Sequence, residues 1–147
     1  MYGYKFIQVK SPDSDVFFIL LNYATKMEII TLLFETCSGN KKTLVNASSM
    51  ARIMSQQHAT ALLSFHAFSG CDTTSAFKGR GKLKPIKVLQ KVLKYENALV
   101  QLGNEWTIPD CVLNEIEALT CQFYGRPRTQ TVNQARYSKV GRLCKHR

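Results

Sequence analysis

The apolar residues of this chain come in short runs, and the longest of them, residues 16–21, contains six residues. A helix needs about 20 apolar residues to cross a bilayer, so the sequence predicts no transmembrane segment and no membrane partner. No secretory signal is visible either, because the first basic residues are followed by Ser11-Pro12-Asp13 and not by a longer apolar stretch. These features indicate an intracellular, globular protein.

Strand and helix signals alternate along the chain and predict an α/β fold. A strand is expected over residues 4–9, and turn residues between 28–36 and 42–45 predict a β-hairpin. Residues 16–23 fit either a short helix or a buried strand. Asn46 is expected to cap a helix, and Gly70 and Gly125 are expected to end two others. Helices are expected over about 48–58, 60–68, 85–95 and 110–124, whereas the last twenty residues are expected to be weakly helical at best.

The charged residues are distributed unevenly. The chain has 20 Lys and Arg against 10 Asp and Glu, and residues 73–147 hold 14 of the basic residues but five of the acidic ones. Within that half, residues 73–95 and 118–147 contain no acid. Such clustering predicts a polyanionic partner, nucleic acid first of all, and favours the nucleus over the cytoplasm. The alternative is a solvated basic face that has no partner.

A histidine and three aromatic residues give weaker signals. His66 falls on an apolar helix and is expected to be a packed or surface residue rather than a ligand. Trp106, Phe123 and Tyr124 could stack on bases, but aromatic residues beside a capped helix are more often part of the core.

Two acidic motifs stand out in the first half, which is otherwise poor in acids. Asp13 and Asp15 follow the expected first strand, where side chains two positions apart can point the same way and share a cation. Asp72 follows Gly70-Cys71 at the end of an expected helix, where a loop carboxylate could act. Each motif has a plain alternative, because Asp-x-Asp after Ser-Pro is a common turn and helix cap, and Gly-Cys-Asp is a common helix end.

Taken together, these motifs resemble the PIN-like nucleases of the flap endonuclease group. Their order and spacing agree over about residues 4–95. The resemblance is carried by Ser11-x-Asp13-x-Asp15 after a strand, an apolar helix ending in Gly70-Cys71-Asp72, Gly79-Arg80-Gly81-Lys82, and the helix that follows. The chain is also similar to a transposon-associated family of animal proteins with a PIN-like core, in Ser69-Gly70-Cys71-Asp72-Thr73-Thr74-Ser75-Ala76-Phe77, Cys121-x-Phe123-Tyr124-Gly125 and Val132-Asn133-x-Ala135-Arg136-Tyr137.

The resemblance implies a fold and a domain organisation. It predicts a partial PIN-like three-layer domain over residues 1–104, with a mixed, mainly parallel sheet and flanking helices. A helix-hairpin element is expected at about 77–95, and a helical, basic extension over 105–147. The group carries further acids on segments upstream of this point, whereas the ten residues before Ser11 contain none, so the chain is expected to match the C-terminal half of such a domain.

The resemblance also implies a site. Asp13, Asp15 and Asp72 are expected to be the catalytic and metal-ligating residues of a metal-dependent, structure-specific nuclease that cleaves phosphodiesters. The cofactor is expected to be Mg²⁺ or Mn²⁺, bound weakly or not at all by this fragment. The residues expected to bind nucleic acid, DNA in the first place, are Gly79, Arg80, Gly81, Lys82, Lys84, Lys87 and Lys91.

The fragment is expected to be weakly active or inactive by itself. The alternative is a non-catalytic nucleic-acid-binding or interaction module derived from such a nuclease. Absence of the first strands of the sheet is expected to leave residues 4–9 as an unpaired edge, through which chains could self-associate.

Overall fold

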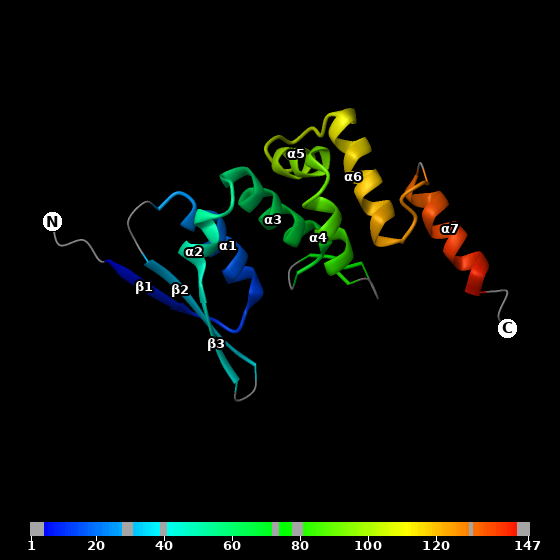
Figure 1. Ribbon diagram of the computed structural model, residues 1–147. Helices are drawn as coiled ribbons and strands as arrows, with labels where there is room; N and C mark the ends of the chain where they lie inside the picture. The colour runs from blue at the N-terminus through cyan, green and yellow to red at the C-terminus, as the bar shows by residue number, and fades with distance from the viewer. Residues whose placement is uncertain are drawn as a thin grey trace. The chain divides into compact units, whose positions relative to one another are not determined.

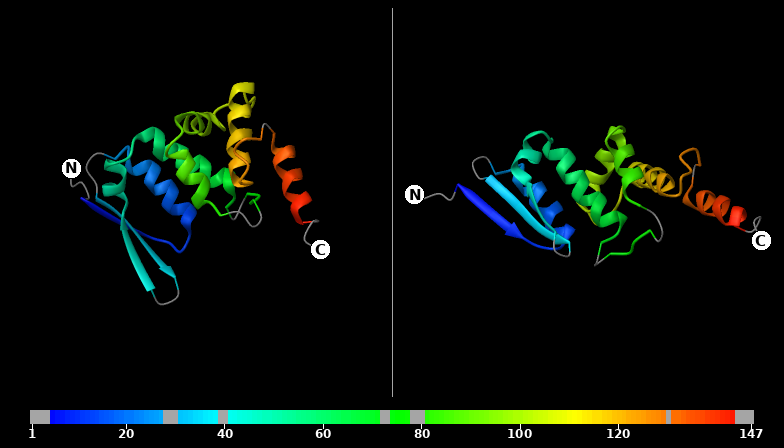
Figure 2. Two further views of the ribbon diagram at one scale, coloured as in Figure 1. Left: turned by 45° about the vertical axis from the view of Figure 1, so that its right-hand side comes forward. Right: turned by 60° about the horizontal axis from the view of Figure 1, so that its bottom comes forward.

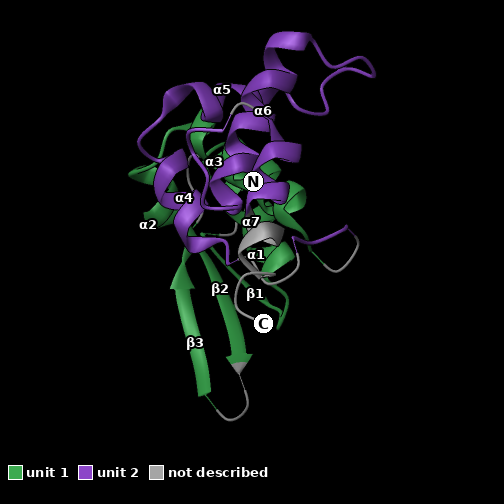
Figure 3. Cartoon of the chain, turned by 90° about the vertical axis from the view of Figure 1, so that its right-hand side faces the viewer, with its two compact units in different colours: residues 1–71 green, residues 72–147 purple. Residues whose placement is uncertain are grey.

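The computed structural model describes residues 5–27, 31–38, 41–71, 74–77, 81–129 and 131–143. Contacts divide the chain into two compact units, residues 1–71 and residues 72–147, which are coloured separately in Figure 3. The described part of the first unit contains a sheet, and that of the second is helical. The expected domain limits, 1–104 and 105–147, come from the resemblance and stay a prediction.

The described residues of the first unit form a three-stranded mixed sheet and three helices (Figure 1). The strand order is β1-β2-β3, with β1 parallel to β2 and β2 antiparallel to β3. The expected α/β class and hairpin are therefore confirmed, and residues 16–23 belong to a helix. The elements are β1 (Phe6–Lys10), α1 (Ser14–Ala24), β2 (Thr31–Ser38), β3 (Lys41–Asn46), α2 (Ala47–Arg52) and α3 (Gln56–Ser69).

Helices α1 and α2 pack on one face of the sheet (Figure 2). Leu32 and Phe34 of β2 are buried on that face, and the ring of Phe17 on α1 lies 5.3 Å from that of Phe34. The pairing register places Phe6 and Leu44 on the opposite face, where both side chains are more than half exposed. Because side chains alternate along a strand, the core of this unit lies between the sheet and its helices.

Local capping sets the limits of α2 and α3. Asn46 Oδ1 accepts the backbone N–H of Ser49 at 2.8 Å, which confirms the expected cap. Ser55 Oγ accepts the N–H of His58 at 3.1 Å and begins α3, so the break between the two helices lies earlier in the chain than expected. Gly70 ends α3 with φ of 106°, a conformation that favours glycine.

The described part of the second unit consists of α4 (Leu83–Leu89), α5 (Leu93–Gln101), α6 (Asp110–Phe123) and α7 (Val132–Leu143). The expectation of one helix over 85–95 is wrong, because the chain is extended at Val92 (φ −127°, ψ 90°). This break lets α4 and α5 each pack against α6, so that both Leu89 and Leu99 are fully buried. α6 matches the expected helix, and Gly125 follows it with φ of 66°.

α7 contradicts the expectation that the last twenty residues are weakly helical at best. The backbone N–H of Val132 donates to Glu117 Oε1 on α6 at 2.8 Å, which anchors the first turn. Thr131 Oγ1 accepts the N–H of Gln134 at 3.3 Å, and Ala135 is fully buried where α7 packs on α6. Tertiary contacts therefore stabilise a helix that the polar, basic sequence alone does not favour.

Candidate functional site

The first candidate site lies where β1 leads into α1, at the carboxyl end of a parallel strand pair. Backbone pairing continues to Ser11, whose N–H donates to the carbonyl of Glu35 on β2 at 3.0 Å. Ser11 Oγ accepts the N–H of Asp13 at 3.1 Å, and Asp13 Oδ1 accepts the N–H of Asp15 at 2.8 Å. Asp13 is thus the N-cap of α1, and Asp15 lies in the first turn, where the helix dipole favours negative charge.

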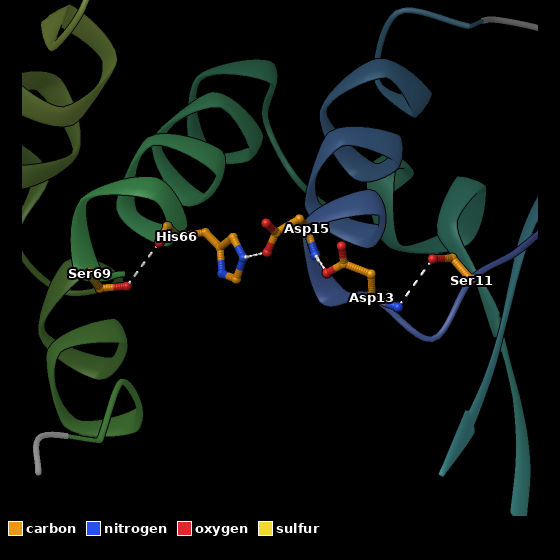
Figure 4. A network of polar contacts seen from close by, with 5 residues as sticks. All are labelled: Ser11, Asp13, Asp15, His66 and Ser69. Carbon is orange, nitrogen blue, oxygen red and sulfur yellow. Dashed lines mark hydrogen bonds and ion pairs between the residues drawn. The ribbon is translucent and has the colours of Figure 1, made fainter. Parts of the chain in front are cut away.

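The carboxylate of Asp15 points at a histidine on another helix. Asp15 Oδ1 lies 2.5 Å from Nε2 of His66 on α3, and Figure 4 shows the two side chains directed toward each other. His66 is buried, whereas 26% of the Asp15 side chain remains exposed. The ring of Phe18 stacks on the imidazole with 4.2 Å between centroids. The contact with the carboxylate holds Nε2 of the imidazole toward α1, and the stacked ring of Phe18 restricts rotation of the imidazole.

Polar contacts join α1 and α3 at both ends, because the two helices are antiparallel. Asn22, near the C-terminal end of α1, accepts hydrogen bonds from Gln56 Nε2 and Thr60 Oγ1, each at 3.0 Å. The contact between Asp15 and His66 joins the other two ends. Since Asn22 and His66 are both buried, these contacts hold Asp15 at a defined place beside the last turn of α3.

Of the three expected metal ligands, the structure brings two together. Asp13 and Asp15 lie on one turn, joined by the cap hydrogen bond, while Asp72 lies outside the described residues. Asp13 performs the capping role that the plain alternative predicts, and Asp15 pairs with His66.

The donor chemistry of this turn fits a hard divalent cation in part. Within the described ranges, no three or more His, Cys, Asp or Glu side chains are grouped so that they could hold a metal ion. In the same ranges, Asp13 Oδ2 has no hydrogen-bond partner, and a carboxylate oxygen is the ligand that Mg²⁺ and Mn²⁺ prefer. A complete site would therefore need donors from outside these ranges.

The second candidate site consists of two lysines on α4, Lys84 and Lys87, and of Lys91 in the turn that follows the helix; these three residues are named here the basic surface. Lys84 and Lys87 are exposed on the helix, and Lys91 follows in the next turn. The spacing of three residues places Lys84 and Lys87 on one side of the helix. Pro85 and Leu89 are buried on the opposite side.

Open space lies beside the basic surface. A surface cavity of about 370 Å³ separates the start of α4 from the end of α6, and it is lined by Gly81, Leu83, Lys84, Pro85, Gln122, Phe123 and Gly125. A Cβ atom at Gly81 would meet no further atom within 4 Å, so close packing does not require glycine there. Lys82 occupies the N-cap position of α4. Gly79 and Arg80 lie outside the described residues, so the expected phosphate-binding hairpin stays a prediction.

The acids of residues 73–147 follow the basic surface in the sequence. Residues 95–125 contain five acids and no Lys or Arg. Lys94, immediately before them, forms an ion pair in which Nζ lies 2.8 Å from Glu115 Oε2, and this contact with the carboxylate raises the pKa of Lys94 above its ordinary value. In the part of the chain that the structure describes, the lysines of the basic surface form no ion pair. Their charge is therefore available to a ligand.

Sequence reasoning missed two features. His66 is packed as expected, but its pairing with Asp15 carries no local signal, because the two residues are 51 positions apart. Trp106 is fully exposed, contrary to the expectation of a core residue, whereas Phe123 is buried and stacks on Phe77 at 4.6 Å. The polar neighbours of Trp106 in the sequence were the available signal, since a turn of this composition rarely enters a core.

Comparisons with known proteins give no match: no protein-family profile, no curated protein and no solved structure matches the chain significantly. The resemblance to PIN-like nucleases therefore depends on its motifs alone. Among the described helices, none combines the length and the hydropathy that spanning a membrane requires.

Proposed function

We propose that this chain binds nucleic acid through the basic surface of α4, as part of a fragment of a PIN-like nuclease. The observation that carries the proposal is the position of Lys84 and Lys87 on one side of a helix whose other side is buried, with the exposed Lys91 in the turn that follows the helix. A row of cations of this kind can follow the phosphates of a duplex without reading its bases. DNA is the proposed ligand, and the nucleus is the proposed location.

The charge distribution of the second unit supports the same proposal. Its acids lie on α5, α6 and their connection, while α4 and the segments beyond α6 are basic. At physiological ionic strength the Debye length is about 8 Å, so acids at the far end of α6 only weakly reduce the potential at α4. Residues 73–95 contain no acid, so the basic surface is a local concentration of positive charge.

The salt dependence of duplex DNA binding tests this function. Each phosphate contact contributes about −0.9 to the slope of log K against log salt concentration, so Lys84→Ala/Lys87→Ala should flatten the slope by about 1.8. Fluorescence anisotropy of a labelled duplex measures it. The matched control is Lys41→Ala/Lys42→Ala, which removes two exposed lysines of β3 and should keep the wild-type slope. An unchanged slope for the α4 variant would contradict the proposal.

The other basic run, beyond α6, is the competing location for this binding. Deleting residues 126–147 is unsuitable as a test, because Ala135 and Val132 pack and bond against α6. Arg128→Ala/Arg136→Ala removes two exposed charges without touching these contacts. We expect this variant to keep most of the wild-type salt-dependence slope. If it lost DNA binding while the α4 variant bound as the wild type does, the binding site would lie in the C-terminal basic run.

One observation favours a second function, the metal-dependent hydrolysis of phosphodiesters. Asp13 and Asp15 lie at the carboxyl end of the parallel strands, the edge at which open α/β sheets bind ligands. By resemblance they would hold Mg²⁺ or Mn²⁺ together with Asp72, and such an ion activates water and stabilises charge on the scissile phosphate. His66 would be a positioning residue, since it holds the carboxylate of Asp15. With these few acids we expect weak activity or none from the chain by itself.

A further inference from the structure

The connection between α5 and α6 exposes the single tryptophan of the chain. Trp106 is fully exposed, and Ile108, which lines the same cavity, is about half exposed. A surface cavity of about 500 Å³ adjoins the indole and is lined by Leu102, Gly103, Asn104, Glu105, Trp106 and Ile108. An exposed tryptophan next to other apolar side chains is uncommon on a surface that has no partner.

Two acidic residues accompany these exposed apolar side chains. Glu105 and Asp110 flank Trp106, and the nearest basic residues in the sequence are Lys94 and Arg126. Among the described residues, neither of the two carboxylates has an ion pair or a side-chain hydrogen bond. We name Glu105, Trp106, Ile108 and Asp110 the acidic corner. Its charge and apolar area fit a partner surface that presents lysines beside an apolar side chain.

The chain itself carries such a surface. Leu83 is exposed at the start of α4, directly before Lys84, and Lys87 lies one turn further along the helix. An ammonium group placed over the indole face would add a cation–π contact to the charge attraction.

The acidic corner and the basic surface lie toward opposite ends of α6. Lys84 shares a cavity with Phe123 and Gly125 at the C-terminal end of α6, whereas Ile108 and Pro109 lead into its N-terminal end. α6 has 14 residues, which correspond to about 21 Å of helix. Lys84 and the acidic corner are therefore about the length of α6 apart and do not meet within one folded chain.

We propose that the acidic corner of one chain docks on the basic surface of a second copy. The contact is head-to-tail, so each copy keeps one surface of each kind and association can continue beyond a dimer. The high net charge does not prevent it, because charges more than about 8 Å apart are largely screened at physiological ionic strength. The same lysines contact nucleic acid in the proposed function, so duplex DNA should compete with the second copy.

Complementary charge reversals test this contact in the absence of nucleic acid. Glu105→Lys/Asp110→Lys and Lys84→Glu/Lys87→Glu should each raise the dissociation constant for self-association about tenfold or more, because like charges then face each other. Mixing the two variants should restore association, since one supplies an intact basic surface and the other an intact acidic corner. Sedimentation equilibrium measures the mass, and Lys41→Glu/Lys42→Glu is the matched control that should associate as the wild type does.

Fluorescence of Trp106 reports on the same contact directly, because the chain has one tryptophan. Its emission should shift to shorter wavelength as the wild-type mass rises, and should not shift for Lys84→Glu/Lys87→Glu alone. A wild type that stays monomeric, a mixture that stays dissociated, or a mass increase without an emission shift would each overturn the proposal. These readouts do not involve DNA, so they are independent of the anisotropy test of the proposed function.

Discussion

Asp15 Oδ1 lies 2.5 Å from His66 Nε2, although the two residues are 51 positions apart in the chain. The contact joins the first turn of α1 to the end of α3, and the histidine side chain is buried. An acid that the resemblance predicts to be a metal ligand thus has a structural partner. The pair can stabilise the fold and can also position a carboxylate for a cation, and experiments can separate these two roles.

Removing either partner of this contact should destabilise the first unit. We expect Asp15→Ala and His66→Phe each to lower the free energy of unfolding by about 1–3 kcal/mol, because a buried polar group or its partner is lost. His66→Phe keeps an aromatic ring stacked on Phe18. Urea denaturation of the single and double variants gives the coupling energy. The control is Asp13→Ala, whose loss of about 1 kcal/mol of capping energy should add to that of His66→Phe. If the losses of unfolding free energy for Asp15→Ala and His66→Phe were also additive, the contact between the two residues would contribute nothing to stability.

Metal binding should depend on charge at Asp13 and not on its cap. Asparagine is as good an N-cap as aspartate, so Asp13→Asn should keep the wild-type stability and yet weaken Mn²⁺ binding. His66→Phe should weaken the same binding by about tenfold, the usual effect of losing a residue that orients a ligand. Calorimetric titration of Mn²⁺ measures both, with Asp72→Asn as the third variant. Titration curves that coincide with the wild type for all three would eliminate the proposed metal site.

The ion pair between Lys94 and Glu115 should make stability depend on pH in the alkaline range. The contact between Lys94 and the Glu115 carboxylate raises the pKa of the lysine in the folded state. The contribution is therefore fully present below the unfolded-state pKa of about 10.4 and is lost as the pH rises through the higher folded-state pKa. Because 55% of the Lys94 side chain is exposed, we expect about 0.2–1 kcal/mol.

Comparison of the wild type with Glu115→Gln in urea denaturation checks this pH dependence. The difference in unfolding free energy should be constant near neutral pH and should vanish above the raised pKa. Lys82→Gln, at the N-cap position of α4, is a control for general charge effects. A difference that persists at the highest pH would mean that the glutamate acts through packing.

The edge of β1 offers a second, separate route to self-association. The N–H of Thr31 donates to the carbonyl of Lys5 and that of Ser11 to Glu35, so by alternation the N–H of Gln8 points away from β2. Gln8→Pro should remove edge pairing and keep the β1–β2 hydrogen bonds. Gln8→Ala is the matched control, because Gln8 also donates to Glu35 at 2.6 Å.

Light scattering of both Gln8 variants measures the effect. If β1 pairs between chains, the proline variant should be less associated than the alanine variant, and the charge-reversal variants of α4 should not share this change. Equal association of Gln8→Pro and Gln8→Ala would exclude the edge as an interface.

Local sequence determined many element limits of this protein. Asn46 caps α2, Gly70 and Gly125 adopt positive φ after their helices, and the hairpin of β2 and β3 forms where turn residues separate two β-prone runs. These features depend on hydrogen bonds and dihedral preferences within a few residues, so the local sequence predicts them. The segregation of charge into the second half is likewise a property of the sequence alone.

Tertiary structure decided what depends on residues that are distant in the chain. α7 forms because Glu117 bonds its first turn and because Ala135 is buried against α6. The break at Val92 follows from the need to bury hydrophobic side chains of both α4 and α5. The pairing of Asp15 with His66 has the same origin, since only the antiparallel packing of α1 and α3 brings them together. Burial and long-range hydrogen bonds outweigh local propensity at these three places. The local sequence does not predict such contacts, because their partners are distant in the chain.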